Sequence, residues 1–225
     1  MMVVMSSTRS LPLLTAIFVT TLIVANTVAS KIGAFGSLFL PVAVVVFPVS
    51  YILSDIITEV YGFRAMRRVI WTGFACNALF ALVVAVALAI PPAPFFSAQD
   101  AFVTTLSATP RILGASFIAY LIGEFTNSTI LAMLKIRTKG KHLWFRTITS
   151  TIIGEGLDSS IFISLAFWGV FPSDVVLTMI VTQWLFKVCF EVLATPFTYL
   201  ITHWLKKSEG IDTFDRGVRF NPFSF

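Results

Sequence analysis

The chain has 225 residues, of which 57% are apolar and only 12% carry a charge. A soluble protein is roughly 45–50% apolar and about 25% charged, so this chain has too little polar surface to cover itself in water. The net charge of +5 does not indicate nucleic-acid binding, because Lys and Arg occur in short clusters between apolar stretches rather than along a basic helix. The composition predicts an integral membrane protein.

Six hydrophobic segments are each close to the ~20 residues that a helix needs to cross a bilayer. We place them, in chain order, at 11–30, 38–61, 68–90, 110–134, 147–171 and 174–205. Together they predict an all-α fold of six transmembrane helices. The first ends in Asn26 and Lys31 and is longer than the apolar core of a signal peptide, so we expect it to remain uncleaved. Pro41 and Pro48 can interrupt the second helix, as in transporter helices that line a cavity.

The longest outer connection, 91–109, contains three prolines followed by Phe95 and Phe96. The prolines favour turns, and the two phenylalanines could form a lid or lie at the membrane interface. The sequence shows no linker or second domain. We therefore predict one transmembrane domain, 1–225, which ends in a short cytoplasmic tail, 208–225.

Residues that commonly bind metals or form disulfides are few. Cys76 and Cys189 lie inside apolar segments and are expected to be small buried residues rather than disulfide partners. His142 and His203 have no partner at metal-ligand spacing. The chain also lacks the sequence G-x-x-x-x-G-K-[ST] of a phosphate-binding loop. Without this loop the chain cannot act as its own ATPase, so any energy it uses must come from a gradient or a partner protein. We also expect no cofactor and no metal.

The positive charges predict the orientation. The outer connections contain only Lys31 and Arg111, and Lys187 lies inside a span, which leaves thirteen of the 16 Lys and Arg residues on the other side. These thirteen are Arg9, Arg64, Arg67, Arg68, Lys135, Arg137, Lys139, Lys141, Arg146, Lys206, Lys207, Arg216 and Arg219. By the positive-inside rule, both termini are expected in the cytoplasm.

Ionisable residues within the predicted spans are the most informative feature, because a charge at that depth costs a few kcal/mol. At ~1.5 Å per residue, several of them fall near the middle of a hydrocarbon layer about 30 Å thick. They carry six negative charges and one positive charge, so some carboxylates must be protonated, or offset by a cation or a ligand. The seven residues are Asp55, Glu59, Glu124, Glu155, Asp158, Lys187 and Glu191.

Structural explanations compete with functional ones for these residues. Lys187 and Glu191 are four residues apart on one helix face and could form a salt bridge that lets the last helix insert. Glu59 could extend toward Arg64 or Arg67 at the cytoplasmic boundary. The acids of the fourth and fifth spans could form a hydrogen-bond network between helices, although we favour a binding function for them.

Two short segments echo each other. Residues 123–128 (Gly-Glu-Phe-Thr-Asn-Ser) and 154–159 (Gly-Glu-Gly-Leu-Asp-Ser) both match G-E-x-x-[ND]-S. Small residues let helices approach closely, and Ser and Asn can form hydrogen bonds between them. The glycines could also loosen each helix. As polar faces of adjacent antiparallel helices, the two segments predict a shared site.

Several segments also carry a family resemblance: 25–31 (Ala-Asn-Thr-Val-Ala-Ser-Lys), 47–55 (Phe-Pro-Val-Ser-Tyr-Ile-Leu-Ser-Asp), 58–62 (Thr-Glu-Val-Tyr-Gly), 146–148 (Arg-Thr-Ile), 187–191 (Lys-Val-Cys-Phe-Glu) and the two echoing segments. Together they resemble the queuosine precursor transporter family, over about residues 11–207. The resemblance implies a multi-pass protein of the bacterial inner membrane that imports 7-cyano-7-deazaguanine, or its 7-aminomethyl relative, for salvage of the tRNA nucleoside queuosine. It also implies similarity to the substrate-binding subunits of energy-coupling-factor vitamin transporters, although the family is described as working without that coupling module.

The implied substrate suits the polar residues. A deazaguanine has adjacent N1–H and NH2 donors, which one carboxylate can accept as a pair. Its carbonyl could accept a hydrogen bond from an Asn side chain or from Lys187, and its flat ring could stack on an aromatic residue such as Trp184. The predicted substrate site consists of Glu124, Asn127, Glu155, Asp158, Asp55, Lys187, Glu191, Asn26, Tyr51 and Phe125.

The leading functional interpretation is gradient-driven uptake through a polar site in the middle of the membrane. One alternative is a vitamin-binding subunit that needs a separate ATPase module. Another is an intramembrane enzyme that uses Glu155 and Asp158, but the chain has neither an H-E-x-x-H motif nor a Ser/His arrangement. We therefore predict a transporter that is not an enzyme. Its expected partners are a small-molecule substrate and the bilayer, with no nucleic acid, and a homo-oligomer is an open alternative.

Reporter fusions test the predicted orientation. A reporter fused after residue 225 should behave as cytoplasmic, and one inserted within 91–109 should behave as periplasmic, because the positive charges stay inside. A periplasmic signal at residue 225 would contradict the arrangement of six spans.

Overall fold

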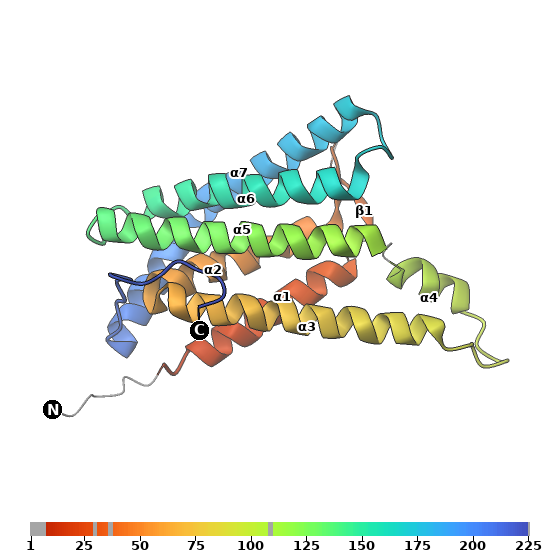
Figure 1. Cartoon of the computed structure of the whole chain (residues 1–225), viewed down its shortest axis with the longest axis horizontal. Coiled ribbons are helices and arrows are strands. Elements are labelled where there is room, and N and C mark those ends of the chain that lie inside the picture. Colours follow the sequence, from red (N-terminus) through yellow and green to blue (C-terminus); the bar gives the residue numbers. More distant parts are fainter. Residues whose placement is uncertain (1–7, 29–30, 36–37, 108–109, 225) are drawn as a thin grey trace.

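Figure 1 shows the computed structural model, an elongated bundle of long helices. The structure describes residues 8–28, 31–35, 38–107 and 110–224. The elements, in chain order, are α1 (Leu11–Val28), β1 (Ile32–Phe35), β2 (Leu38–Pro41), the 3-10 helix η1 (Val42–Val45), α2 (Phe47–Tyr61), α3 (Phe63–Ala89), α4 (Gln99–Leu106), α5 (Pro110–Arg137), α6 (Leu143–Phe167) and α7 (Ser173–Glu209). The fold is helical apart from one short hairpin.

The outside of the bundle is apolar, and the inside holds many polar and charged side chains beside an apolar core. Among the described residues, four stretches are long and apolar enough to cross a membrane: Leu11–Val28, Phe63–Ala89, Gln99–Arg137 and Ser173–Glu209. Large apolar side chains such as Leu193, Phe197, Leu200 and Trp204 are exposed on α7, while charged side chains are buried between helices. This inversion of a soluble fold suits a multi-pass membrane protein, because lipid rather than water covers its surface.

Helix α2 occupies the centre of the bundle. It has only 15 residues, too few to cross a bilayer by itself, and it packs against α1, α3, α5 and α7. Most of its residues are buried, including Ser50, Ser54 and Asp55. A short helix with polar residues is tolerated here because other helices, rather than lipid, surround it.

The second predicted helix, 38–61, was wrong over its first nine residues. Leu38–Pro41 instead forms strand β2, which pairs antiparallel with β1, and α2 begins only at Phe47. Pro48 lies in the first turn of α2, where the proline's missing N–H would have no helical partner. The proline therefore marks the start of α2 rather than a break inside it.

The other helix ends differ by smaller amounts. Helix α3 begins at Phe63 rather than at 68, α5 extends to Arg137, and α7 extends to Glu209. The outer connection also contains helix α4. The two thiols are free, as expected, but Cys189 is exposed on α7 rather than buried.

The two ends of the described chain lie at the same end of the bundle. The N–H of Ser10, just before α1, donates a hydrogen bond of 2.7 Å to Glu209 Oε1 at the end of α7. In Figure 1 this end is on the left, and the β1–β2 hairpin and α4 are on the right. The assignment of the left end to the cytoplasm is a prediction from the charges.

Residues 210–224, which we call the C-terminal strap, fold back onto the bundle. The N–H of Thr213 donates to Val60 O (3.1 Å), and the N–H of Phe63 donates to Asp215 Oδ2 (2.8 Å). Between these contacts, Gly62 joins α2 to α3 with φ +84°. The predicted tail is therefore a packed segment rather than a free end.

Aromatic side chains hold the rest of the strap. Phe220 lies edge-on to Phe63, with ring centroids 5.2 Å apart, and Phe223 contacts Trp71 at 5.6 Å. Trp71 Nε1 also donates a hydrogen bond of 2.9 Å to Pro222 O. The strap thus covers the beginning of α3.

Replacing Gly62 by Ala should release the strap. A Cβ at this position would lie 2.7 Å from Thr213 Cγ2, and its φ of +84° with ψ of 170° disfavours any other residue by about 1–3 kcal/mol. Gly210→Ala is the matched control, since Gly210 also has a positive φ but has nothing within 4 Å of its Cβ position. Only Gly62→Ala should expose the strap to proteolysis in detergent. Equal protection of both variants would contradict the packing.

Candidate functional site

Four helices, α2, α5, α6 and α7, bring most of the predicted ionisable residues together inside the bundle. We call this group the central polar cluster: Asp55, Glu124, Asn127, Glu155, Asp158, Lys187 and Glu191. All are buried except Asp158, whose side chain is 22% exposed. Buried charges persist only where they are paired, hydrogen-bonded or neutralised, so their contacts indicate their roles.

Lys187 of α7 pairs with the neighbouring helix. Its Nζ lies 2.7 Å from Glu155 Oε2 and 2.5 Å from Asp158 Oδ2, both on α6. The predicted salt bridge between Lys187 and Glu191 was wrong, because both ion pairs of Lys187 in the described chain are made with α6. Both carboxylate oxygens of Glu191 are buried without a hydrogen-bond partner among the described residues.

A second set of contacts joins α2 to α5. Ser54 Oγ donates a hydrogen bond of 2.7 Å to Glu124 Oε2, and Asn127 Nδ2 donates one of 2.6 Å to Asp55 Oδ1. Within the described chain, Asp55 Oδ2 and Asn127 Oδ1 have no partner. Tyr51, one turn before Asp55, is buried and its hydroxyl lies 3.5 Å from the carbonyl of Lys187. The contacts therefore run from α5 through α2 to α7.

Several buried hydroxyl groups around the cluster also lack partners in the described chain. Helical Ser and Thr usually donate to a carbonyl one turn back, as Thr195 does to Glu191 O at 2.8 Å. The exceptions lie on α2, α5 and α6: Thr58, Ser128, Thr151 and Ser159. An unsatisfied buried polar group costs about 1–3 kcal/mol, so a cluster of them is suited to receiving polar ligands or protons.

The echoing segments pack reciprocally. A Cβ on Gly123 would lie 2.8 Å from Asp158 Cβ, and one on Gly154 would lie 2.7 Å from Asn127 Cβ. The first residue of each motif therefore packs on the fifth residue of the other, which explains why both need Gly at that position. Both glycines lie inside continuous helices, so they permit close approach and do not loosen the helix.

A second group of charges, the inner charge network, lies one turn from Asp55. The buried Glu59 contacts Arg146 Nη2 at 2.9 Å, Lys206 Nζ at 2.6 Å and Lys135 Nζ at 3.6 Å. The predicted extension of Glu59 toward Arg64 or Arg67 was therefore wrong. Residues from α5, α6 and α7 reach Glu59 because α2 lies between these helices.

The strap completes the inner charge network through Asp212. Its Oδ1 lies 2.5 Å from Lys135 Nζ and 2.9 Å from Lys206 Nζ. Burial acts to raise the pKa of Asp212, but the hydrogen bonds from the two lysines outweigh it, so the pKa is lowered. Asp212 therefore stays ionised at neutral pH and links the strap to the bundle.

Two of the predicted site residues lie elsewhere. Asn26 of α1 donates a hydrogen bond of 2.7 Å to Asn77 Oδ1 of α3. Phe125 packs in the apolar core, with its ring 6.4 Å from Phe63 and 6.0 Å from Trp71. Both side chains contact α3, which contributes no residue to the central polar cluster.

Sequence reasoning missed the neutral members of the site: Ser54, Thr58, Ser128, Thr151 and Ser159. A signal was available for all of them except Ser54, because the other four occur three or four positions from a predicted acid and so share its helix face. Hydroxyl residues are common in membrane helices, however, and spacing alone does not separate those that face the interior.

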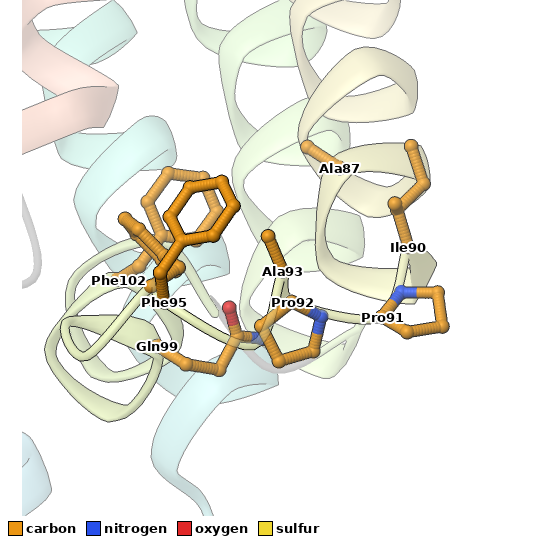
Figure 2. Close-up of a pocket in the computed structure, with 9 residues that line it drawn as sticks. Ala87, Ile90, Pro91, Pro92, Ala93, Phe95, Gln99 and Phe102 are labelled. Atoms are coloured by element: carbon orange, nitrogen blue, oxygen red, sulfur yellow. The ribbon is translucent and has the colours of Figure 1, made fainter.

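A hollow lined mainly by apolar side chains lies apart from the central polar cluster. Figure 2 shows it between the end of α3 and α4, with a volume of about 300 Å³ and a lining of apolar residues such as Ile90, Pro91 and Phe102. Phe95, one of the predicted lid residues, is 91% exposed there. Apart from Gln99 the lining has no polar side chain, so a polar solute would gain few contacts in it.

A multi-pass bundle that holds charged groups between its helices has the architecture of a membrane transporter. Residues 41–201 match the family described as "Putative vitamin uptake transporter", and the chain belongs to this family. It is 26% identical, over 160 residues, to the "Probable queuosine precursor transporter" of Bacillus subtilis (strain 168), which covers 71% of this chain and 70% of the relative. The family is named for transport rather than for catalysis. No solved structure matches, so the similarity to energy-coupling-factor subunits stays a prediction.

Gly154→Ala should separate α5 from α6. The added Cβ would lie 2.7 Å from Asn127 Cβ and 3.0 Å from the Asn127 backbone N, which cannot rotate away. We expect a destabilisation of about 1–3 kcal/mol, as for other overpacked sites, seen as a lower melting temperature in detergent. Gly114→Ala on α5 is the control, because nothing lies within 4 Å of its Cβ position. Equal melting temperatures for the two variants would contradict the reciprocal packing.

Proposed function

We propose that this protein carries a queuosine precursor, 7-cyano-7-deazaguanine or its 7-aminomethyl relative, across the bacterial inner membrane into the cytoplasm. The observation that carries the proposal is the central polar cluster: carboxylates from neighbouring helices, buried together with amide and hydroxyl groups that lack partners among the described residues. The family and the Bacillus subtilis relative supply the class of solute.

The substrate site is centred on the two echoing segments. Glu124 and Glu155 each have one carboxylate oxygen engaged, by Ser54 and by Lys187. One of these carboxylates would accept the adjacent N1–H and NH2 donors of the deazaguanine, a charge-assisted pair that no neutral side chain reproduces. Asp158 and Asn127 lie beside them across the α5–α6 contact and complete the polar wall.

Lys187 and Tyr51 serve the rest of the ring. Lys187 Nζ is held between two carboxylates and could donate to the substrate carbonyl without an uncompensated positive charge. Tyr51 is the candidate for stacking, because it is buried on α2 with its hydroxyl near α7, whereas Phe125 belongs to the apolar core.

Uptake would be driven by a gradient. Five carboxylates and one ammonium cannot all be ionised in a buried site without a large cost in free energy. Some of the carboxylates would therefore bind protons, and proton binding would be linked to transport. Because the cluster is buried, substrate would reach it from each side in turn as helices move, with both termini in the cytoplasm.

Glu124→Gln and Glu155→Gln test the substrate site. Glutamine keeps the size but replaces an acceptor oxygen with a donor that would face the substrate donors. Two hydrogen bonds to a charged group are worth about 1.5–3 kcal/mol each, so at least one variant should bind 7-cyano-7-deazaguanine about 100-fold more weakly. Calorimetry on purified protein measures this, with the yield of inserted protein recorded alongside.

Two controls sharpen that test. Asp100→Asn makes a comparable change on exposed α4 and should leave the affinity unchanged. A 7-deazapurine that lacks the amino group should bind weakly to the unmodified protein. Reduced yield with normal affinity in both Gln variants would show that the glutamates form only a helix–helix network, and no binding to the unmodified protein would overturn the proposed function.

A further inference from the structure

We infer that Glu191 of α7, together with Asp55 of α2, binds the proton that couples uptake to the pH gradient, at a place separate from the acids that bind substrate. The inference rests on the proposed function and assigns its driving ion to particular side chains. It follows from how differently the five acids of the cluster are compensated.

Four of the five acids have at least one hydrogen-bond donor beside them, and three of these four belong to the proposed substrate site. Glu155 and Asp158 share the ammonium of Lys187, at 2.7 Å and 2.5 Å. Glu124 accepts the hydroxyl of Ser54 at 2.7 Å. These contacts stabilise negative charge, so these acids are ready to accept donors from a substrate.

Glu191 has no such partner in the described chain. Its side chain is 0% exposed and neither of its oxygens accepts a hydrogen bond from a described residue. The nearest donor is the Thr147 hydroxyl of α6, which lies beside Glu191 but also donates to Trp144 O at 3.2 Å, so it gives Glu191 at most a weak, shared contact. Burying an ionised carboxylate without a partner costs several kcal/mol, so the protonated, neutral form of Glu191 is favoured at this position.

Asp55 is the second acid of this pair. It is 0% exposed and accepts one hydrogen bond, from Asn127, while its Oδ2 has no described partner. Asp55 interacts electrostatically with Glu191 across the contact between α2 and α7, and Glu155 of α6 is a further acid close to both. Two neighbouring carboxylates repel each other when both are ionised, and one shared proton removes that repulsion.

An independent observation points to the same place. Asn127 is 1% exposed, and its amide nitrogen is bonded to Asp55 while its Oδ1 lacks a described partner. That oxygen can accept the O–H of a protonated carboxyl group but offers nothing to a bare carboxylate.

The other charged and titratable groups around the pair come from all four helices. They are Tyr51 on α2, Glu124 on α5, Glu155 and Asp158 on α6, and Lys187 on α7. The only cation among them is engaged with α6. The inner charge network, one turn away, has its own balance of charges around Glu59. Among the described residues, no free cation therefore replaces a proton as the counter-charge of Glu191.

The transport step involves only the making and breaking of one O–H bond. A proton from the outer side binds the ionised pair, and the same proton leaves to the cytoplasm after substrate release. The helices α2 and α7 also meet at the ion pair between Glu59 and Lys206, so a change of charge at Asp55 and Glu191 acts on two helices that are already linked electrostatically. Protonation of Glu191 and Asp55 would in this way alter the contact between α2 and α7, and no second coupling ion is needed.

Proteoliposomes containing Glu191→Gln test the inference. Glutamine keeps the shape of Glu191 but cannot bind or release a proton. The sequence placed Glu191 in the substrate site, but the proposed site is centred on Glu124, Glu155 and Asp158 and does not use it. We therefore expect exchange of labelled 7-cyano-7-deazaguanine across the membrane to continue, with a Kd within about threefold of the unmodified protein, a free-energy change below about 1 kcal/mol. A gradient of one pH unit can support about tenfold accumulation for one proton per substrate, and this accumulation should fall to none.

Matched variants make the result decisive. Asp174→Asn changes an exposed acid on the same helix and should accumulate substrate normally. Glu191→Asp keeps a titratable group and should retain accumulation with a shifted pH profile, so it tests the inference even if the Gln variant does not insert.

The outcomes separate this inference from the proposed function. Full accumulation by Glu191→Gln, or loss of binding together with accumulation, would overturn the assignment of Glu191 to the proton. If the unmodified protein exchanges substrate but ignores the pH gradient, proton coupling is wrong while the proposed function stands. If it neither binds nor exchanges the deazaguanine, the proposed function fails.

Discussion

A charge inside a membrane protein must find its partner on another helix, and the bundle is organised around that requirement. Lys187 on α7 reaches two acids on α6, and Glu59 on α2 receives cations from α5, α6 and α7. Removing one partner of such a buried pair leaves an uncompensated charge, which costs about 3–5 kcal/mol. The pairs therefore determine which helices lie next to each other.

The central position of α2 follows from the same requirement. A helix of 15 residues with Asp55 and Glu59 on one face is a poor membrane span, yet it is well placed when other helices enclose it. Gly62 and the C-terminal strap hold its inner end, and the β1–β2 hairpin precedes its outer end. The elements on either side of α2 thus hold it at the depth where its acids meet those of the other helices.

The two groups of charges differ in how fully their acids are paired with cations. In the inner charge network, Glu59 is surrounded by Arg146, Lys206 and Lys135, so it serves as a tie between helices. In the central polar cluster, acids outnumber cations, and several oxygens have no described partner. Burying these unpaired groups costs free energy unless they gain hydrogen bonds or protons. A cluster of this kind is therefore suited to binding a polar solute or a proton.

The burial of Lys135 and Arg146, which the sequence placed among the cations of the cytoplasmic side, was not foreseen. The sequence by itself determined the class of protein, the helices, the acids and the lysine at membrane depth, and the two G-E-x-x-[ND]-S segments. These features are local, because hydropathy and helix periodicity depend only on neighbours along the chain. Only the tertiary structure decided the partner of Lys187, the partners of Glu59, the start of α2 at Phe47 and the exclusion of Asn26 and Phe125 from the cluster. The physical reason is that a spacing of four residues places two side chains on one face of a helix, whereas the energy of a buried charge depends on which other helix that face meets.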